Sequence, residues 1–454
     1  MLIWSIFTVV IASILLLSDT VFDYFCYFEI TFFSVPFVLL PIICIFAAEN
    51  FTIVMDIEEL YVSSSRLAKA TSLRFKRYLY DVVDWDVRML CIRGARGVGK
   101  TTMMLQRIRD QQYRPSQALY VSLDDLWFME HRLIDLADYH YTHGGTHLFV
   151  DEVHRYPFGT WSQELKNIYD RYPGFHIVFS GSSMLQLDQS SADLSRRCIF
   201  YDMQGLSFRE HLILEQHANI PLLTLGTLLA NHEQIAADIA AGTKVLPLFN
   251  DYLHHGYYPF YRELHGSYSK AVQQVVSSII DTDIPAVEKI EYITATKLKR
   301  LFVILSRTVP FTLNLTSLGQ QIEAPRQRVL RMCHLLQQAG LTVMLYSQKN
   351  SLSQLGKPEK LYLENPNLLY AMTANAGIGT VRETFFVNQM KASHSLTFTG
   401  TGDFLVDDTT TFEVGGRGKT FDQIKDQPDS YLAVDDIETG HAHRVPLWMF
   451  GLLY

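Results

Sequence analysis

Short apolar runs, separated by polar or glycine-containing segments, recur between residues 87 and 204. Helix-patterned segments such as Thr102–Asp110 lie between them. Strands that are apolar on both faces are typical of parallel sheets covered by helices. The pattern predicts an α/β domain whose parallel sheet contains Val87–Ile92, Ala118–Leu123, Leu148–Glu152, His176–Phe179 and Cys198–Met203.

Residues 1–54 are far more apolar than the rest of the chain. Met1–Leu17 and Ile30–Ala48 are nearly continuous apolar runs, each close to the lower limit for crossing a hydrocarbon core about 30 Å thick. The first Lys or Arg is Arg66, which favours a cytoplasmic location for the body. Two interpretations remain open: a membrane hairpin in residues 1–48 tethers the body, or translation starts at Met55 and the extension is a gene-model artefact.

The segments after the predicted sheet are mostly helix-patterned. Residues 205–292 predict a helical lid or connector, and residues 293–350 predict a winged helix-turn-helix. DNA contact through this module and a role in protein contacts are both open. The second helix of the helix-turn-helix carries Arg326, Arg328 and Arg331.

Composition narrows the class of protein. A chain of 454 residues has room for about three domains, and its 48% hydrophobic and 19% charged residues exclude a disordered chain. The formal net charge of −8 argues against a generally basic nucleic-acid coat and leaves only a local DNA-reading face. The five scattered cysteines form no CxxC pair, which is typical of a reducing compartment.

A GxxxxGK[ST] motif lies between the first predicted strand and the helix that follows it. Its glycines let backbone N–H groups surround phosphates, and the helix N-terminus favours their negative charge. Lys100 is expected to reach the β- and γ-phosphates, and Thr101 to bind Mg²⁺. We therefore predict an ATP site formed by Gly94, Ala95, Arg96, Gly97, Val98, Gly99, Lys100, Thr101 and Thr102.

Two carboxylates end the strand-like run Leu148–Glu152. P-loop NTPases hold Mg²⁺ with an acid in this position, which predicts Asp151 as the second metal ligand. Glu152 is placed to polarise the attacking water as a general base, so we assign catalysis to Glu152 and Lys100.

Further polar residues lie between the last two predicted strands, His176–Phe179 and Cys198–Met203. Ser180 is the best candidate to hydrogen-bond the γ-phosphate or the attacking water, and a plain Ser/Gly turn is the alternative. Arg196 and Arg197 are either surface residues or fingers that reach the nucleotide of a neighbouring subunit, which would require a homo-oligomer.

The run LFVDEVHRYPFGTWSQELKNIYDRYPGFHIVFSGSSML, with the P-loop before it and GLSFREHL after it, resembles the AAA-type ATPase domain of a broad prokaryotic family. Proteins of that family resemble AAA+ enzymes and carry a winged-helix segment and a C-terminal restriction-endonuclease-like domain. The resemblance implies an ATPase core at residues 55–204 and an endonuclease-like domain at residues 351–454. It also implies ATP and Mg²⁺ binding by Lys100, Thr101, Asp151 and Glu152.

The C-terminal segment carries acids at spacings that resemble the endonuclease-like core. A helix-like segment with Glu383 comes first. Asp403 then precedes one strand-like run, and Glu413 lies in the next. In such a core Asp and Glu bind Mg²⁺ and a lysine orients the attacking water. Gly415 stands where that lysine is expected, although Lys419 could substitute from a shifted position. An inert fold used for binding or assembly is therefore favoured over active cleavage.

Four histidines precede the acidic strand: His131, His140, His143 and His147. The spacing of His143 and His147 invites a metal site, but the two glycines between them disfavour a helix that presents both rings. We interpret these residues as loop and strand-entry histidines.

The sequence as a whole predicts a P-loop ATPase whose turnover changes the conformation of a winged-helix and nuclease-like C-terminal region. Its cofactors would be ATP and Mg²⁺, and its further partners DNA, a second copy of the chain, and a membrane if residues 1–54 are genuine. The alternatives are a nucleotide-gated binding switch with little turnover and an ATP-regulated DNA nuclease.

Overall fold

The computed structural model describes residues 57–181, 194, 196–285, 290–308, 311–312, 314–347 and 358–454. The chain divides into two units, Met1–Glu59 and Leu60–Tyr454. The apolar extension at residues 1–54 and Met55 lie outside the described residues. None of the helices in the described ranges has the length and apolar character needed to cross a membrane.

The first part of the unit Leu60–Tyr454 is built on a parallel sheet with the strand order β2-β3-β4-β1-β5. Leu90, Cys91 and Ile92 of the inner strand β1 are fully buried, as continuous apolar runs require. Because β4 lies between β1 and β3, the carboxyl ends of these three strands are neighbours. The strands are β1 (Met89–Arg93), β2 (Ala118–Ser122), β3 (His147–Asp151), β4 (His176–Gly181) and β5 (Ile199–Asp202).

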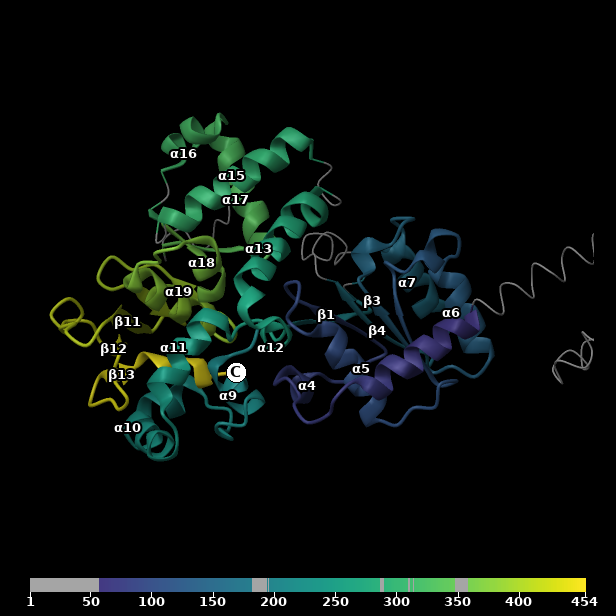
Figure 1. Ribbon diagram of the computed structural model, residues 1–454, viewed down its shortest axis with the longest axis horizontal. Coiled ribbons are helices and arrows are strands. Elements are labelled where there is room, and N and C mark those ends of the chain that lie inside the picture. Colours follow the sequence, from purple (N-terminus) through teal and green to yellow (C-terminus); the bar gives the residue numbers. More distant parts are fainter. Residues whose placement is uncertain are drawn as a thin grey trace, which may run out of the picture. The chain divides into compact units, whose positions relative to one another are not determined.

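Helices connect the strands and lie beside the sheet (Figure 1). They include α4 (Leu79–Val82), α5 (Lys100–Asp110), α6 (Leu133–Thr142) and α7 (Trp161–Arg171), with short 3₁₀ turns at Leu126–Met129 and Val153–Arg155. α5 begins at Lys100, two residues earlier than the sequence pattern predicts. The reason is that Gly99, in the left-handed conformation, turns the chain directly into the helix.

Most of residues 205–285 form helices. The elements are α9 (Phe208–Leu214), α10 (Leu225–Gly242), α11 (Val245–His255), α12 (Tyr261–Leu264), a 3₁₀ turn at His265–Ser267, α13 (Tyr268–Ser278) and a π-helical turn at Ile279–Asp283 that continues α13. α9 begins with a capping box in which the side chains of Ser207 and Glu210 each bond the other residue's backbone N–H.

Three helices and a small antiparallel sheet follow. They are α15 (Tyr292–Thr308), β6 (Phe311–Thr312), α16 (Leu315–Ile322), α17 (Arg326–Gln338), β7 (Thr342–Leu345) and β8 (Lys360–Leu363). The strand order is β6-β8-β7. Glu323, with φ +53°, makes the sharp turn between α16 and α17.

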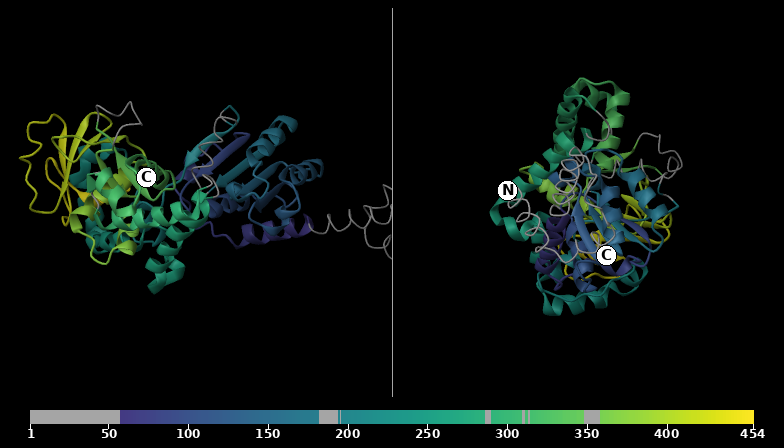
Figure 2. Two further views of the ribbon diagram at one scale, coloured as in Figure 1. Left: turned by 90° about the horizontal axis from the view of Figure 1, so that it is seen from above. Right: turned by 90° about the vertical axis from the view of Figure 1, so that its right-hand side faces the viewer.

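The last part of the chain forms a mixed sheet of order β13-β12-β11-β10-β9, drawn in yellow tones in Figure 2. β9, β10 and β11 are antiparallel, whereas β11, β12 and β13 are parallel. The elements are α18 (Pro366–Met372), α19 (Ile378–Met390), β9 (Leu396–Thr397), β10 (Phe404–Val406), β11 (Thr410–Gly415), β12 (Ser430–Val434), β13 (Arg444–Pro446) and a 3₁₀ helix at Leu447–Leu452.

A continuous cluster of buried apolar side chains runs from Ala68 near the parallel sheet to Leu453. Trp448 and Phe450 of the last 3₁₀ helix are buried in it, and this helix packs against α9 and α19. The parallel sheet, the connector and the C-terminal sheet therefore share apolar packing.

Candidate functional site

The glycine-rich loop Gly94–Gly99 lies between β1 and α5, at the carboxyl edge of the sheet. Gly97 and Gly99 have φ values of +84° and +103°, a conformation that side chains other than glycine rarely adopt. No side chain caps the first turn of α5. Its backbone N–H groups are therefore free of a side-chain acceptor and open toward an anion.

Lys100 is the first residue of α5 and is almost fully buried. Its Nζ donates hydrogen bonds to the carbonyl oxygens of Gly94 (2.9 Å) and Ala95 (3.0 Å). Burial lowers the pKa of Lys100, while Glu152 and Asp151 act in the opposite direction. The ammonium is held over the loop, where a phosphate would meet it.

Asp151 ends β3 and is 1% exposed. Its carboxylate accepts hydrogen bonds from Thr101 Oγ1 (2.5 Å), Tyr120 Oη (2.9 Å) and Ser180 Oγ. The predicted residues Thr101, Asp151 and Ser180 are thus brought together, and Tyr120 is a fourth member that sequence reasoning missed. Burial, followed by Asp151, raises the pKa of Tyr120, so this phenol stays a hydrogen-bond donor.

Glu152 lies in a left-handed turn with φ +52° rather than in the strand. Its side chain remains 23% exposed, and its Oε2 is 3.4 Å from His154 Nε2. Burial, helped by Arg155 and Lys100, lowers the pKa of His154 to about 3, which keeps the ring neutral. Glu152 is therefore accessible to water beside a neutral imidazole.

Two buried charged residues that the sequence analysis did not identify, Arg77 and Glu210, hold the glycine-rich loop in place. Arg77 pairs with Glu210 through Nε–Oε1 (2.9 Å) and Nη2–Oε2 (3.0 Å). Arg77 Nη1 also donates to the carbonyl oxygen of Val98 in the loop (2.5 Å). Arg77 and Glu210 lie 133 positions apart, so no local sequence pattern links them.

An aromatic ring packs on the loop. A Cβ added to Gly97 would lie 2.7 Å from Cε1 of Phe260. The aromatic segment 256–261 is thus partly core, with Tyr257 and Tyr258 buried, and partly a neighbour of the glycine-rich loop.

Of the two candidate arginine fingers, Arg197 is engaged within its own chain. Its Nε and Nη2 form a bidentate pair with Asp170 at 2.8 and 2.9 Å. Arg196 is exposed. A role for Arg197 on a neighbouring nucleotide would require that pair to break.

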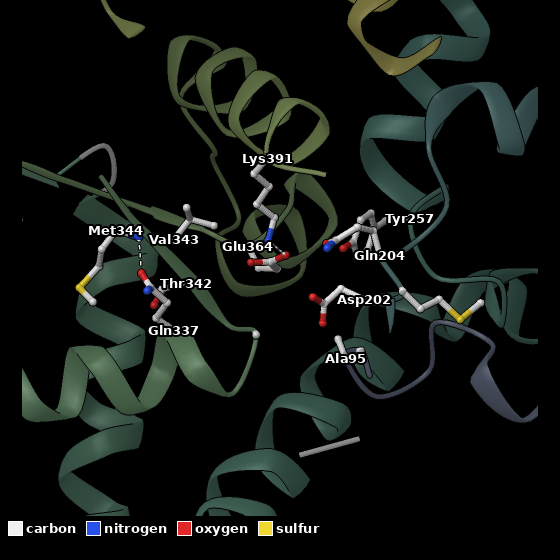
Figure 3. A pocket seen from close by; sticks show the side chains of 13 residues that line it. Ala95, Asp202, Gln204, Tyr257, Gln337, Thr342, Val343, Met344, Glu364 and Lys391 are labelled. Carbon is white, nitrogen blue, oxygen red and sulfur yellow. Dashed lines mark hydrogen bonds and ion pairs between the residues drawn. The ribbon is translucent and has the colours of Figure 1, made fainter. Parts of the chain in front are cut away.

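A cavity of about 270 Å³ adjoins the start of the glycine-rich loop (Figure 3). Ala95 and Asp202 lie on one side of it, and Gln337 and Thr342 on the other. Glu364 in its lining is ion-paired with Lys391. At its border the turn between α17 and β7 comes close to the loop: a Cβ on Gly340 would lie 3.6 Å from Cβ of Ala95.

The acids of the C-terminal segment also come together. Lys360 Nζ lies 3.5 Å from Glu383 Oε2 and 3.4 Å from Asp403 Oδ1. Glu413 is ion-paired with Lys419. A Cβ on Gly415 would lie 2.7 Å from Cγ of Lys419, so the stem of Lys419 fills the space of a side chain at position 415.

Each of the four histidines hydrogen-bonds to or stacks on a neighbouring residue. His140 lies inside α6, not in a loop, and bonds Tyr61 Oη (2.7 Å) and the carbonyl oxygen of His147 (3.0 Å). His131 stacks on Trp127. Within the part of the chain that the structure describes, no three or more His, Cys, Asp and Glu side chains are grouped as in a metal centre.

Comparisons with known proteins assign part of this region to a class. Residues 86–212 match the family model described as an AAA domain. The parallel sheet with its helices in this region fits the α/β fold of P-loop NTPases. Residues 246–379 match a family described as a domain of unknown function (DUF8612).

One relative is the uncharacterized protein MJ1637 of Methanocaldococcus jannaschii. It is 26% identical over 309 residues, which are 63% of this chain and 64% of that protein. The chain therefore spans less than two thirds of that relative's length.

Solved structures resemble the chain only weakly. The Aeropyrum pernix ORC1 protein in complex with DNA is 11% identical, with a TM-score of 0.29 over 69% of this chain and 92% of that one. AMPPCP-bound DnaA from Aquifex aeolicus is 14% identical, with a TM-score of 0.24 over 58% of this chain and 84% of that one. Similarity at this level does not establish a shared activity.

Proposed function

We propose that this protein binds ATP with Mg²⁺ and hydrolyses it in the AAA-type domain. The observation that carries the proposal is the convergence of Lys100, Thr101 and Asp151 at the carboxyl edge of the sheet, beside an uncapped helix N-terminus. This constellation is what a triphosphate needs: backbone donors, a cation and oxygen ligands for a metal.

Thr101 and Asp151 would hold the magnesium ion. Their oxygens lie 2.5 Å apart, and a hydroxyl with a carboxylate is a donor set that suits Mg²⁺. The ion, when bound, neutralises charge on the β- and γ-phosphates. Tyr120 and Ser180 orient the Asp151 carboxylate through hydrogen bonds.

Lys100 would exchange its bonds to the loop carbonyls for the β- and γ-phosphates, with Gly94–Gly99 and Thr102 around them. Glu152 would accept the proton of the attacking water, because it is the carboxylate that is both next to Asp151 and open to water. Ser180 would contact the γ-phosphate side of the site. Phosphoryl transfer then depends mainly on positioning and electrostatics.

Turnover would be coupled to the rest of the chain through direct contacts. Gly340 approaches Ala95 at the start of the loop, and Phe260 packs on Gly97. The helices α15–α17 with the sheet β6-β8-β7 support the winged helix-turn-helix assignment, whose strands flank the helices in this way. Its exposed arginines would contact DNA, and the protein would act in the cytoplasm, alone or as a homo-oligomer.

ATP turnover by the full chain tests the proposal. Lys100→Ala is expected to abolish nucleotide binding, and Glu152→Gln to keep binding while reducing turnover by about a hundredfold or more. Phosphate release and equilibrium binding of a fluorescent ATP analogue are the measurements. A wild-type rate equal to that of Lys100→Ala, with binding retained, would instead identify a nucleotide-gated switch.

A second candidate function, an ATP-regulated nuclease, is favoured by the position of Lys419. Its stem fills the place of the lysine that is missing at Gly415, and Glu413 Oε2 is buried without a hydrogen-bond partner among the described residues. Asp403 and Glu413 would hold a divalent cation, which activates water in such sites. Lys360 would then have to leave Asp403.

Plasmid cleavage with ATP and Mg²⁺ or Mn²⁺ tests this second function. If the second function is right, the wild-type chain nicks the plasmid and Glu413→Ala leaves it intact. If the wild type leaves the plasmid uncut under every condition, the C-terminal domain serves binding or assembly only.

A further inference from the structure

A buried carboxylate from the helical connector reaches the edge of the nucleotide site. Asp283 ends the π-helical turn that continues α13, and it is 3% exposed. Its Oδ1 lies 2.7 Å from Arg155 Nη2, 3.9 Å from Arg96 Nη1 and 4.0 Å from His154 Nε2. π-helical turns are rare and occur frequently at functional sites.

The two arginines that face Asp283 belong to the two loops that form the site. Arg96 is in the glycine-rich loop, and Arg155 follows Asp151 and Glu152 in the 3₁₀ turn Val153–Arg155. Burial raises the pKa of Asp283, while Arg155 and Arg96 oppose that rise and Glu152 adds to it. Lys100 also acts on Asp283 electrostatically, so the carboxylate lies within the field of the phosphate-binding lysine.

A carboxylate and a terminal phosphate bind arginine in the same way. Both accept bidentate, charge-assisted hydrogen bonds, but a phosphate carries more charge and one more oxygen. A carboxylate buried without a cation is costly, so Asp283 depends on these arginines in its present place. A triphosphate bound to Lys100 would bring its terminal phosphate to the same two loops. This phosphate would compete with Asp283 for the two arginines.

We propose that Arg96 and Arg155 form a subsite for the terminal phosphate of a nucleoside triphosphate, and that Asp283 occupies this subsite in the nucleotide-free protein. The inference rests on the proposed ATP site and adds a means of distinguishing triphosphate from diphosphate. When the phosphate takes the arginines, Asp283 loses its partners. The change reaches α13 and α15, because the π-helical turn packs against both helices.

Nucleotide titrations of the full chain test this competition. Asp283→Asn removes the competing charge, so a non-hydrolysable ATP analogue is expected to bind about tenfold more tightly. ADP lacks the terminal phosphate, and its affinity is expected to change by less than about twofold. Arg155→Gln removes the cation that lies closest to Asp283, and it is expected to weaken binding of the ATP analogue selectively.

Asp281→Asn is the matched control. Asp281 lies in the same π-helical turn, but its side chain is 46% exposed and pairs with Lys299. An Asp283→Asn protein with the same ATP-to-ADP preference as this control would overturn the inference, as would an Arg155→Gln protein with the wild-type preference.

Different results would refute the ATP site and the role of Asp283. If wild type binds neither nucleotide, the ATP site itself is wrong and the subsite falls with it. If wild type binds ATP, Lys100→Ala does not, and Asp283→Asn leaves the preference unchanged, the ATP site stands and only the role of Asp283 is refuted.

Discussion

The Asp151 carboxylate accepts hydrogen bonds from hydroxyl groups on three different elements. Thr101 comes from α5, Tyr120 from β2 and Ser180 from β4. The sequence identified Thr101 and Ser180 because they follow recognisable strand and loop patterns. Tyr120 lies inside an apolar strand, where an aromatic residue is usually core, and its role depends on which strand neighbours β3.

At the same scale, His140 makes the stability of the fold depend on pH. Burial lowers the pKa of His140 to about 4, whereas a histidine in an unfolded chain titrates near 6.5. As the pH falls from about 6.5 toward 4, His140 binds a proton in the unfolded chain but stays neutral in the folded chain. His140 therefore lowers the free energy of unfolding by about 1.4 kcal/mol per pH unit in that window.

We expect His140→Gln to reduce this slope. The glutamine amide can still donate to the carbonyl oxygen of His147, and it does not titrate. Urea unfolding between pH 7.5 and 4 measures the change. Parallel stability curves for wild type and His140→Gln would contradict the buried, neutral state of His140.

At the scale of elements, α17 carries three exposed arginines. Arg326, Arg328 and Arg331 are exposed on it, while Val329 and Met332 of the same helix are buried. The apolar positions and the turn at Glu323 fix which face packs against α15 and α16. DNA contact through the three exposed arginines stays a prediction.

Binding of a labelled DNA duplex to the full chain tests this face. Arg326→Ala with Arg328→Ala is expected to weaken binding and to reduce the slope of log K against log salt by about 0.9 for each arginine lost. Arg307→Ala, an exposed arginine on α15, is the control. If the double variant and the control bind DNA equally, α17 serves protein contacts.

At the scale of the whole unit Leu60–Tyr454, the AAA-type domain and the later segments are packed into one another. The cluster of buried apolar residues crosses every predicted boundary between 204 and 351. Ser207 Oγ donates to the carbonyl oxygen of Tyr454 (2.5 Å), and Glu210 from the same capping box holds Arg77 behind the loop. These hydrogen bonds connect the glycine-rich loop to α9, and α9 to Tyr454.

The sequence alone determined the parallel sheet, the glycine-rich loop and the pair of acids at the carboxyl end of β3, because each is a local pattern of hydrophobicity or spacing. It also indicated that Lys419 could replace the lysine that is missing at Gly415. Only the tertiary structure decided that Lys419 fills the space at Gly415, that Arg77 holds Val98, and that Asp283 faces Arg96 and Arg155. Those contacts join residues far apart in the chain, and their geometry follows from how the elements pack, which no periodicity along the sequence encodes.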